Sequence, residues 1–154
     1  MDFQLNLDSE TVEHAHPGKP ICVDCQVTIR QVFESLKEHG RGAVLICRDG
    51  AIEGIFTERD ALRLMADGAD LDLRIEEVMV RTPVTLSSRD TVGKAIAMMS
   101  KGGYRRLPIV NGENQPVGIV KVSGILHYLV EHFPKVVYTL PPSPHHATQE
   151  REGA

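Results

Sequence analysis

The sequence predicts an α+β fold in which a unit of helix, strand, strand and helix occurs twice. Apolar residues recur at helical spacing in two long segments, and two short apolar runs separated by a turn follow each segment. The halves also align, since Gly118 stands 64 positions after Gly54 and Thr91 stands 63 positions after Thr28. One inserted residue explains the difference, so the chain indicates an internal duplication.

The first unit begins with the extended stretch KPICVDCQV and continues into a helix. Apolar residues line one face of that helix, namely Ile29, Val32, Phe33 and Leu36. Thr28 and Gln31 form the pattern of a capping box, and Gly40 suits the end of the helix. A hairpin with strands at 43–47 and 51–56 follows, and TERDALRLMA is the second helix.

The second unit repeats this order. Its entry stretch, VMVRTPVTL, is extended because Pro83 disfavours helical geometry at Thr82. A helix over TVGKAIAMMS, a strand over RRLPIV, a turn over NGENQP and a strand over VGIV follow. The closing helix, SGILHYLVEHF, has an apolar face of Ile125, Leu126, Leu129, Val130 and Phe133.

These patterns divide the chain into four segments. Residues 1–19 are an N-terminal arm, in which Phe3, Leu5 and Leu7 alternate and suit an edge strand. Residues 20–77 and 78–134 are the two repeats, and residues 135–154 are a C-terminal extension. We expect the tail of this extension, PPSPHHATQEREGA, to be largely disordered because it has few apolar side chains to bury.

Composition argues against several classes of function. The chain has 154 residues and is 42% hydrophobic, enough for a core without disulfides. Its formal net charge is −4 and only 5% of its residues are aromatic, so it lacks a basic field and stacking platforms for nucleic acid. No run approaches the ~18 apolar residues of a membrane span. With no leader pattern and three cysteines that cannot all pair, we expect a cytoplasmic protein.

Three stretches, taken together, are specific enough to indicate a protein family: VTIRQVFESLKEHGRGAVLICRDGAIEGIFTERD, VMVRTPVTL and YRRLPIVNGENQPVGIV. They resemble the paired CBS domains of a Bateman module over about residues 20–133. The resemblance implies a βαββα unit in each half, with the two sheets packed about a pseudo-twofold axis and two clefts between them. It also implies an adenosine-containing ligand and a homodimer. We therefore expect a stand-alone regulatory protein that signals to an unknown protein target in trans.

The stretch GIFTERD predicts a ligand site at the join of a strand and a helix. Gly54 permits close approach, the Thr57 hydroxyl lies beside free backbone N–H groups, and Asp60 can accept hydrogen bonds from a ribose diol. A simple helix cap by Thr57 is the alternative. The family's ribose and phosphate pattern matches these three residues, whereas Lys121 and Gly124 replace the hydroxyl and the carboxylate in the second half. We therefore expect one competent cleft and one degenerate cleft.

The resemblance also implies that the other half completes the competent cleft. The residues concerned are Arg81, Thr82, Pro83, Tyr104, Arg105 and Arg106. Thr82 and its backbone would meet an adenine edge, and one arginine would hold phosphate, because strand alternation places Arg105 and Arg106 on opposite faces. A solvated strand end is the alternative for each arginine. AMP, ADP and ATP lead as ligands, with S-adenosylmethionine, NAD and cyclic di-AMP behind them, and no cofactor is required.

Two other classes of function remain as alternatives. One is a ligand-free dimeric interaction module. The other is a small metal or thiol redox protein that uses His14, His16, Cys22 and Cys25, although the order and spacing of these residues are not those of a usual zinc finger. We expect structural cysteines instead, since Cys22 and Cys25 point to opposite faces of an extended strand. The motifs GxSxG, GxxxxGK[ST] and GxGxxG are absent, so the sequence does not predict an enzyme.

Overall fold

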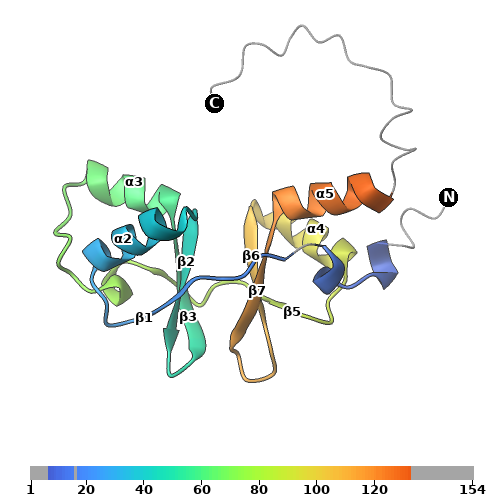
Figure 1. Cartoon of the computed structure of the whole chain (residues 1–154), viewed down its shortest axis with the longest axis horizontal. Coiled ribbons are helices and arrows are strands. Elements are labelled where there is room, and N and C mark those ends of the chain that lie inside the picture. Colours follow the sequence, from blue (N-terminus) through green and yellow to red (C-terminus); the bar gives the residue numbers. More distant parts are fainter. Residues whose placement is uncertain (1–6, 16, 133–154) are drawn as a thin grey trace, which may run out of the picture.

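The fold consists of two βαββα repeats whose sheets face each other, with the helices on the outside (Figure 1). The computed structural model describes residues 7–15 and 17–132. The elements, in chain order, are η1 (Val12–His14), β1 (Cys22–Asp24), α2 (Ile29–His39), β2 (Ala43–Arg48), β3 (Ala51–Thr57), α3 (Glu58–Ala66), η2 (Ile75–Glu77), β4 (Val80–Arg81), β5 (Leu86–Ser87), α4 (Val92–Gly102), β6 (Arg106–Val110), β7 (Pro116–Lys121) and α5 (Val122–His132).

Several expectations concern residues outside the described part of the chain. They are the edge pairing of Phe3 and Leu5, the ligand role of His16, the apolar contact of Phe133 and the disorder of the tail in 135–154. These remain predictions.

Each repeat builds one sheet. The first sheet has the strand order β1-β2-β3-β4 and the second has the order β5-β6-β7. In both repeats the entry strand runs parallel to the next strand, and a hairpin then adds an antiparallel strand. Leu45 and Ile52 of the first sheet cluster with Ile119 of the second, so apolar contacts join the two sheets. The predicted duplication and fold class are confirmed.

Local hydrogen bonds set the ends of the helices where the sequence predicted them. Thr28 and Gln31 form a capping box at the start of α2, and Thr91 accepts a hydrogen bond from the Lys94 N–H at the start of α4. Gly40 ends α2 with a φ of +60°. This left-handed conformation costs glycine little because it has no Cβ.

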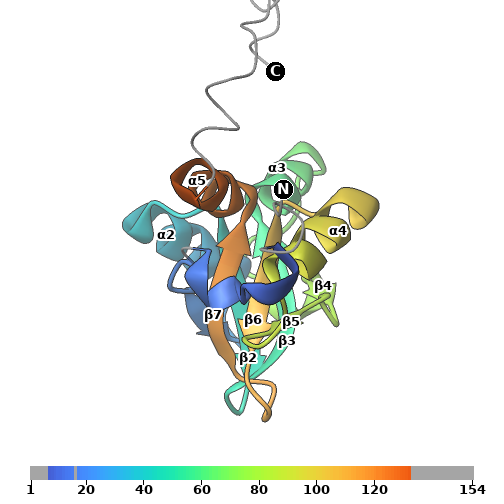
Figure 2. The ribbon, with the colours of Figure 1, turned by 90° about the vertical axis from the view of Figure 1, so that its right-hand side faces the viewer.

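A segment at or just before the start of each repeat packs on the sheet of the other repeat. The N–H of Gly18 donates to the Ile119 carbonyl at 2.8 Å, and the Ile119 N–H donates back at 3.0 Å. In the same way, β4 pairs with β3 of the first sheet. Figure 2 shows the N-terminal segment in front of β7. The two repeats are therefore tied by exchanged segments.

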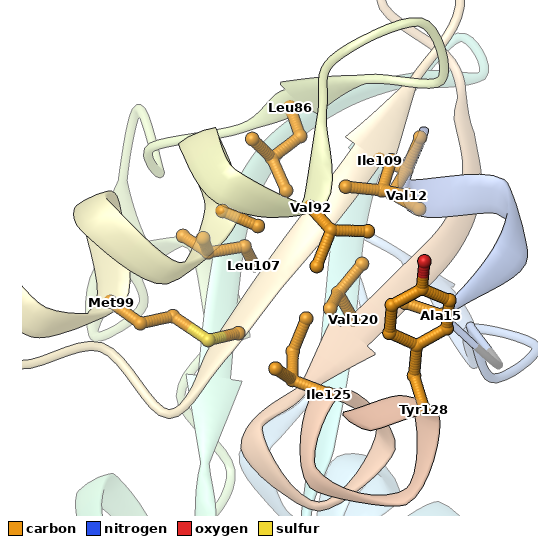
Figure 3. Packing of buried hydrophobic residues seen from close by; sticks show 11 residues of the cluster. Val12, Ala15, Leu86, Val92, Met99, Leu107, Ile109, Val120, Ile125 and Tyr128 are labelled. Carbon is orange, nitrogen blue, oxygen red and sulfur yellow. The ribbon is translucent and has the colours of Figure 1, made fainter. Parts of the chain in front are cut away.

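The exchanged segments also supply core residues. Val12 and Ala15 lie in the core of the second repeat and are close to Ile109 and Tyr128 (Figure 3). Val12 is completely buried, and burying a valine of this kind contributes about 1.5 kcal/mol or more. Met79, at the start of the second repeat, lies in the same way in the core of the first repeat. The two cores thus fix the exchanged segments in position. These segments in turn help to set how the two repeats lie against each other.

Candidate functional site

A cavity of about 950 Å³ lies where the strand ends of the two repeats meet. It is lined by the end of β3 and the start of α3, by the chain after β4, by the stretch between α4 and β6, and by the end of β7 and the start of α5. Of the predicted site residues, the cavity brings together Thr57, Asp60, Thr82, Pro83, Tyr104, Arg105 and Arg106. Gly54 and Arg81 do not line it.

Thr57 and Asp60 hold each other in place at the start of α3. The Asp60 N–H donates to the Thr57 hydroxyl oxygen at 3.4 Å, and the Thr57 N–H donates to Asp60 Oδ2 at 2.9 Å. The Thr57 hydroxyl also donates to Oδ2 at 3.1 Å. The motif is therefore a helix cap, as the alternative interpretation expected. Both bonds to the Asp60 carboxylate use Oδ2, however, so Oδ1 has no partner among the described residues and remains available to accept from a ligand hydroxyl.

Gly54 and Arg81 set the position of β4, and neither contacts the cavity. A Cβ on Gly54 would overlap Met79 Sδ and would lie 3.0 Å from the Val80 carbonyl oxygen, so only glycine lets this strand approach β3. Arg81 pairs with Gly54 in the sheet register, and its guanidinium donates to the Glu76 carbonyl at 2.6 Å. These contacts bring the following residues to the cavity.

Thr82 lies at the cavity with a strained backbone. Its φ is +50°, which is unfavourable for a β-branched residue because the Cβ crowds the backbone. The Thr82 N–H donates to the Glu53 carbonyl at 3.0 Å, and Pro83 follows directly. Strain of this kind costs about 1–3 kcal/mol and occurs often at ligand sites.

Tyr104 lies on the end of α4, and both neighbouring arginines line the cavity. A methyl group on Gly102 would overlap the Tyr104 ring, so the ring rests on the backbone of the helix end. The expectation that only one arginine faces the cleft differs from the structure. Arg105 precedes β6, which begins at Arg106, so strand alternation does not govern the Arg105 side chain.

Sequence reasoning did not select four further lining residues that bear on binding: Glu58, Arg59, Lys121 and Leu126. Glu58 and Arg59 lie inside the TERD motif and could have been noticed there. Lys121 was considered only as a sign that the second cleft is degenerate. The position of Lys121 at this cavity depends on how the ends of β3 and β7 meet. No local sequence pattern indicates that meeting.

The counterpart cavity on the other side of the repeats is much smaller, with about 20 Å³, which is room for about one water molecule. It is lined in part by Lys19, Pro20, Arg41 and Gly42. The Arg41 guanidinium donates to the Lys19 carbonyl at 3.1 Å, and the Arg106 guanidinium lies against Gly42. Arginine side chains therefore occupy much of the space between these segments.

The cysteines are free, and they do not form a metal cluster within the described residues. Cys22 is exposed on β1 and Cys25 is buried, but Cys25 lies in the turn after β1, so strand alternation does not explain the difference. The Cys22 and Cys47 thiols lie near enough to influence each other's pKa. Burial, followed by the neighbouring Cys22 thiol, raises the pKa of Cys47 to about 12, and burial also raises the pKa of Cys22. Both thiols are therefore protonated and weakly nucleophilic at neutral pH.

Within residues 7–15 and 17–132, no helix is both long and apolar enough to cross a membrane.

A family model described as "CBS domain" matches the chain twice, at residues 12–67 and 75–131. The CBS domain-containing protein YhcV of Bacillus subtilis is 34% identical over 99 residues, which are 64% of this chain and 70% of that protein. An uncharacterized 33.4 kDa protein of Thermofilum pendens is 33% identical over 102 residues, which are 66% of this chain. The match covers only 33% of the length of the Thermofilum protein.

Solved structures have the same fold. The CBS domain pair of protein MJ0100, in complex with 5′-methylthioadenosine and S-adenosyl-L-methionine, is 25% identical with a TM-score of 0.69, and the match covers 76% of this chain and 97% of that one. A CBS domain protein from Pyrobaculum aerophilum complexed with AMP is 23% identical with a TM-score of 0.70, and the match covers 79% and 98%.

Proposed function

The chain belongs to the CBS domain family, and from this premise we propose that it is a regulatory module that binds an adenosine nucleotide in the large cavity and signals by a change of conformation. One observation carries the proposal. The cavity joins Thr57 and Asp60 of the first repeat to Thr82 and Tyr104 of the second. Its volume of about 950 Å³ lies in the range of small-molecule sites.

Each part of the cavity matches one part of a nucleotide. Asp60 Oδ1 is placed to accept from a ribose hydroxyl, since Oδ2 is already bonded to Thr57. The extended backbone after Thr82 offers polar groups to an adenine edge, and the Arg105 and Arg106 guanidinium groups supply donors for phosphate. The adenosine compounds bound by the MJ0100 pair support this ligand class. We rank AMP, ADP and ATP before S-adenosylmethionine, NAD and cyclic di-AMP.

The asymmetry of the two cavities supports a single ligand site. The small cavity of about 20 Å³ has no room for a nucleoside. Its counterparts of Thr57 and Asp60 are Lys121 and Gly124, and Gly124 has no carboxylate for a ribose. One competent and one degenerate cleft thus remain our proposal for the unliganded protein.

Signalling is proposed to pass through a homodimer and a protein target in trans. Helices α3 and α5, one from each repeat, both lie at the upper side of the molecule in Figures 1 and 2. They expose Leu62, Met65, Leu126 and Val130, whose exposed fractions range from 42% to 71%. A second copy would cover this apolar face, and Leu126 also lines the ligand cavity, so a ligand would act directly beside the interface. The role is regulatory, without catalysis, and the free cysteines fit the cytoplasm.

Titration calorimetry with AMP, ADP, ATP, S-adenosylmethionine, NAD and cyclic di-AMP tests the proposal. Asp60→Asn keeps an acceptor for the Thr57 N–H but removes the carboxylate charge. We expect its affinity to fall about ten- to a hundredfold, equal to roughly 1.4–2.7 kcal/mol. Asp67→Asn is the matched control, because Asp67 is exposed at the end of α3 and outside the cavity.

Two outcomes would oppose the proposal. Equal affinities of Asp60→Asn and the wild type would remove Asp60 from the site. Silence across the whole panel, together with a dimer in sedimentation, would favour the ligand-free interaction module.

A further inference from the structure

An extra residue in β3 lies beside the strained backbone of Thr82. The register of β3 against β2 shifts between Ile52 and Gly54, so Glu53 has no partner on β2 and forms a bulge. The Glu53 carbonyl accepts a hydrogen bond from the Thr82 N–H at 3.0 Å. Bulges occur often next to functional sites, because they change the direction of a strand and of its side chains. This bulge holds Thr82, which lines the cavity.

The Glu53 side chain is held from outside the cavity. Arg48, at the end of β2, donates through Nε to Glu53 Oε2 at 2.9 Å and through Nη2 to Glu76 Oε1 at 2.8 Å. The other oxygen, Glu53 Oε1, is buried and has no hydrogen-bond partner among the described residues. None of these three side chains lines the cavity. One arginine thus connects the bulge of β3 to η2.

These contacts close into a ring around Thr82. The Arg81 guanidinium donates to the Glu76 carbonyl at 2.6 Å, and Arg81 directly precedes Thr82. The ring therefore runs from Glu53 through Arg48, Glu76 and Arg81 to Thr82, and back to the Glu53 carbonyl. An unfavourable backbone conformation persists only where several surrounding contacts impose it. The ring supplies such contacts for the φ of +50° at Thr82.

The corresponding residues of the second repeat cannot form this ring. The bulge of β7 falls at Val117, 64 positions after the bulge of β3, and valine has no carboxylate. The antiparallel bridge of Gly18 with Ile119 places Pro20 opposite Val117, where Thr82 stands in the first repeat. Proline has no N–H to donate to the bulge carbonyl. Pro20 lines the small cavity, so the ring accompanies only the large one.

We propose that Arg48 is a positioning residue for the large cavity, because through Glu53 and Glu76 it holds the backbone of Thr82 in the conformation that the ligand requires. The inference rests on the proposed adenosine site and adds a determinant of its affinity that lies outside the cavity. Without Arg48, Glu53 and Glu76 lose the cation that they share, and their like charges repel each other. Thr82 then relaxes from its positive φ, and the edge of the cavity at Pro83 moves.

The test measures the affinities for AMP and ATP by titration calorimetry at pH 7, at a temperature where every variant is folded. The proteins are the wild type, Arg48→Met, Thr82→Asn and the double variant. Methionine keeps an unbranched stem but cannot bridge two carboxylates, and asparagine tolerates a positive φ better than threonine. We expect Arg48→Met to lower affinity about fivefold, but less than about twofold beside Thr82→Asn, because asparagine needs less support.

Two measurements separate positioning from a general effect on the fold. Arg30→Met is the matched control, since it removes an exposed ion pair with Asp72 and should leave the affinity unchanged. In the protein without ligand, Arg48→Met should shift the NMR resonance of the Thr82 Cα and speed exchange of the Thr82 amide proton about threefold or more. Arg30→Met should change neither signal.

The outcomes distinguish this inference from the proposed function. Equal losses of affinity from Arg48→Met in both backgrounds, or an equal loss in Arg30→Met, would refute the positioning role while the adenosine site stands. If neither nucleotide binds the wild type, the adenosine function fails, and the NMR measurement decides the positioning role by itself. Unchanged Thr82 signals in Arg48→Met would then refute it as well.

Discussion

Replacing Gly102 by alanine should separate ligand binding from stability. The new methyl group would overlap the Tyr104 ring, which must then leave its place at the cavity. Gly102 is the last residue of α4 and has an ordinary helical backbone, so alanine favours the helix by up to about 1 kcal/mol. Tyr104 is 40% exposed and belongs to none of the buried core clusters, so its ring can move without opening a core.

The expected result is therefore weaker binding in a protein that is as stable as the wild type or more so. An aromatic contact with a base contributes about 1–3 kcal/mol, so we expect affinity for ATP to fall about fivefold or more. The melting temperature should stay the same or rise by up to about 4 °C. Calorimetric titration and thermal unfolding of the same preparation measure the two quantities.

Two further variants make the test sharp. Tyr104→Ala should weaken binding to the same extent, and adding Gly102→Ala to it should cause no further loss, because both act through one ring. Gly40→Ala is the control for a helix-end glycine outside the cavity, where a φ of +60° makes alanine destabilising without any effect on binding. Unchanged affinity of Gly102→Ala, or additive losses in the double variant, would refute the role assigned to Tyr104.

Two predictions concern backbone strain and charge. Thr82→Asn should raise the free energy of unfolding by about 0.5–1 kcal/mol, since asparagine tolerates a φ of +50° better than threonine; a loss of stability in urea unfolding would show that the backbone is not strained. Hydrogen bonding to Arg48 lowers the pKa of Glu53. The Glu53 carboxylate therefore stabilises the fold at pH values above its ordinary pKa of 4.5, and this stabilisation is lost as the pH falls through the lowered pKa. Arg48→Met should therefore lose less stability than the wild type between pH 7 and pH 3 in urea titrations, and equal losses would contradict this linkage.

Much of the fold could be predicted because its signals are local. The capping boxes of Thr28 and Thr57 need partners only three residues away, and the hairpins are formed by strands that a short turn connects. The candidate site was partly predicted for the same reason, since Thr57 and Asp60 are neighbours on one helix end. The family resemblance added Thr82 and Tyr104 from the other repeat.

Other features depend on which distant segments meet. Gly54 and Arg81 belong to the predicted site, yet they position β4 and do not line the cavity, since Met79 packs over Gly54 and Arg81 pairs with Gly54 in the sheet. Gly18 pairs with Ile119 across 101 positions, which the pattern of an N-terminal arm does not indicate.

By itself, the sequence determined the duplication, the alternation of helices and strands, and the Thr57–Asp60 cap, because each follows from periodicity or from hydrogen bonds between near neighbours. Only the tertiary structure decided that one cavity is large and its counterpart almost closed, and that Lys121 of the second repeat charges the first site. The physical reason is that these features arise where the two sheets pack together, and the packing of side chains from distant segments sets the space and the charge between them.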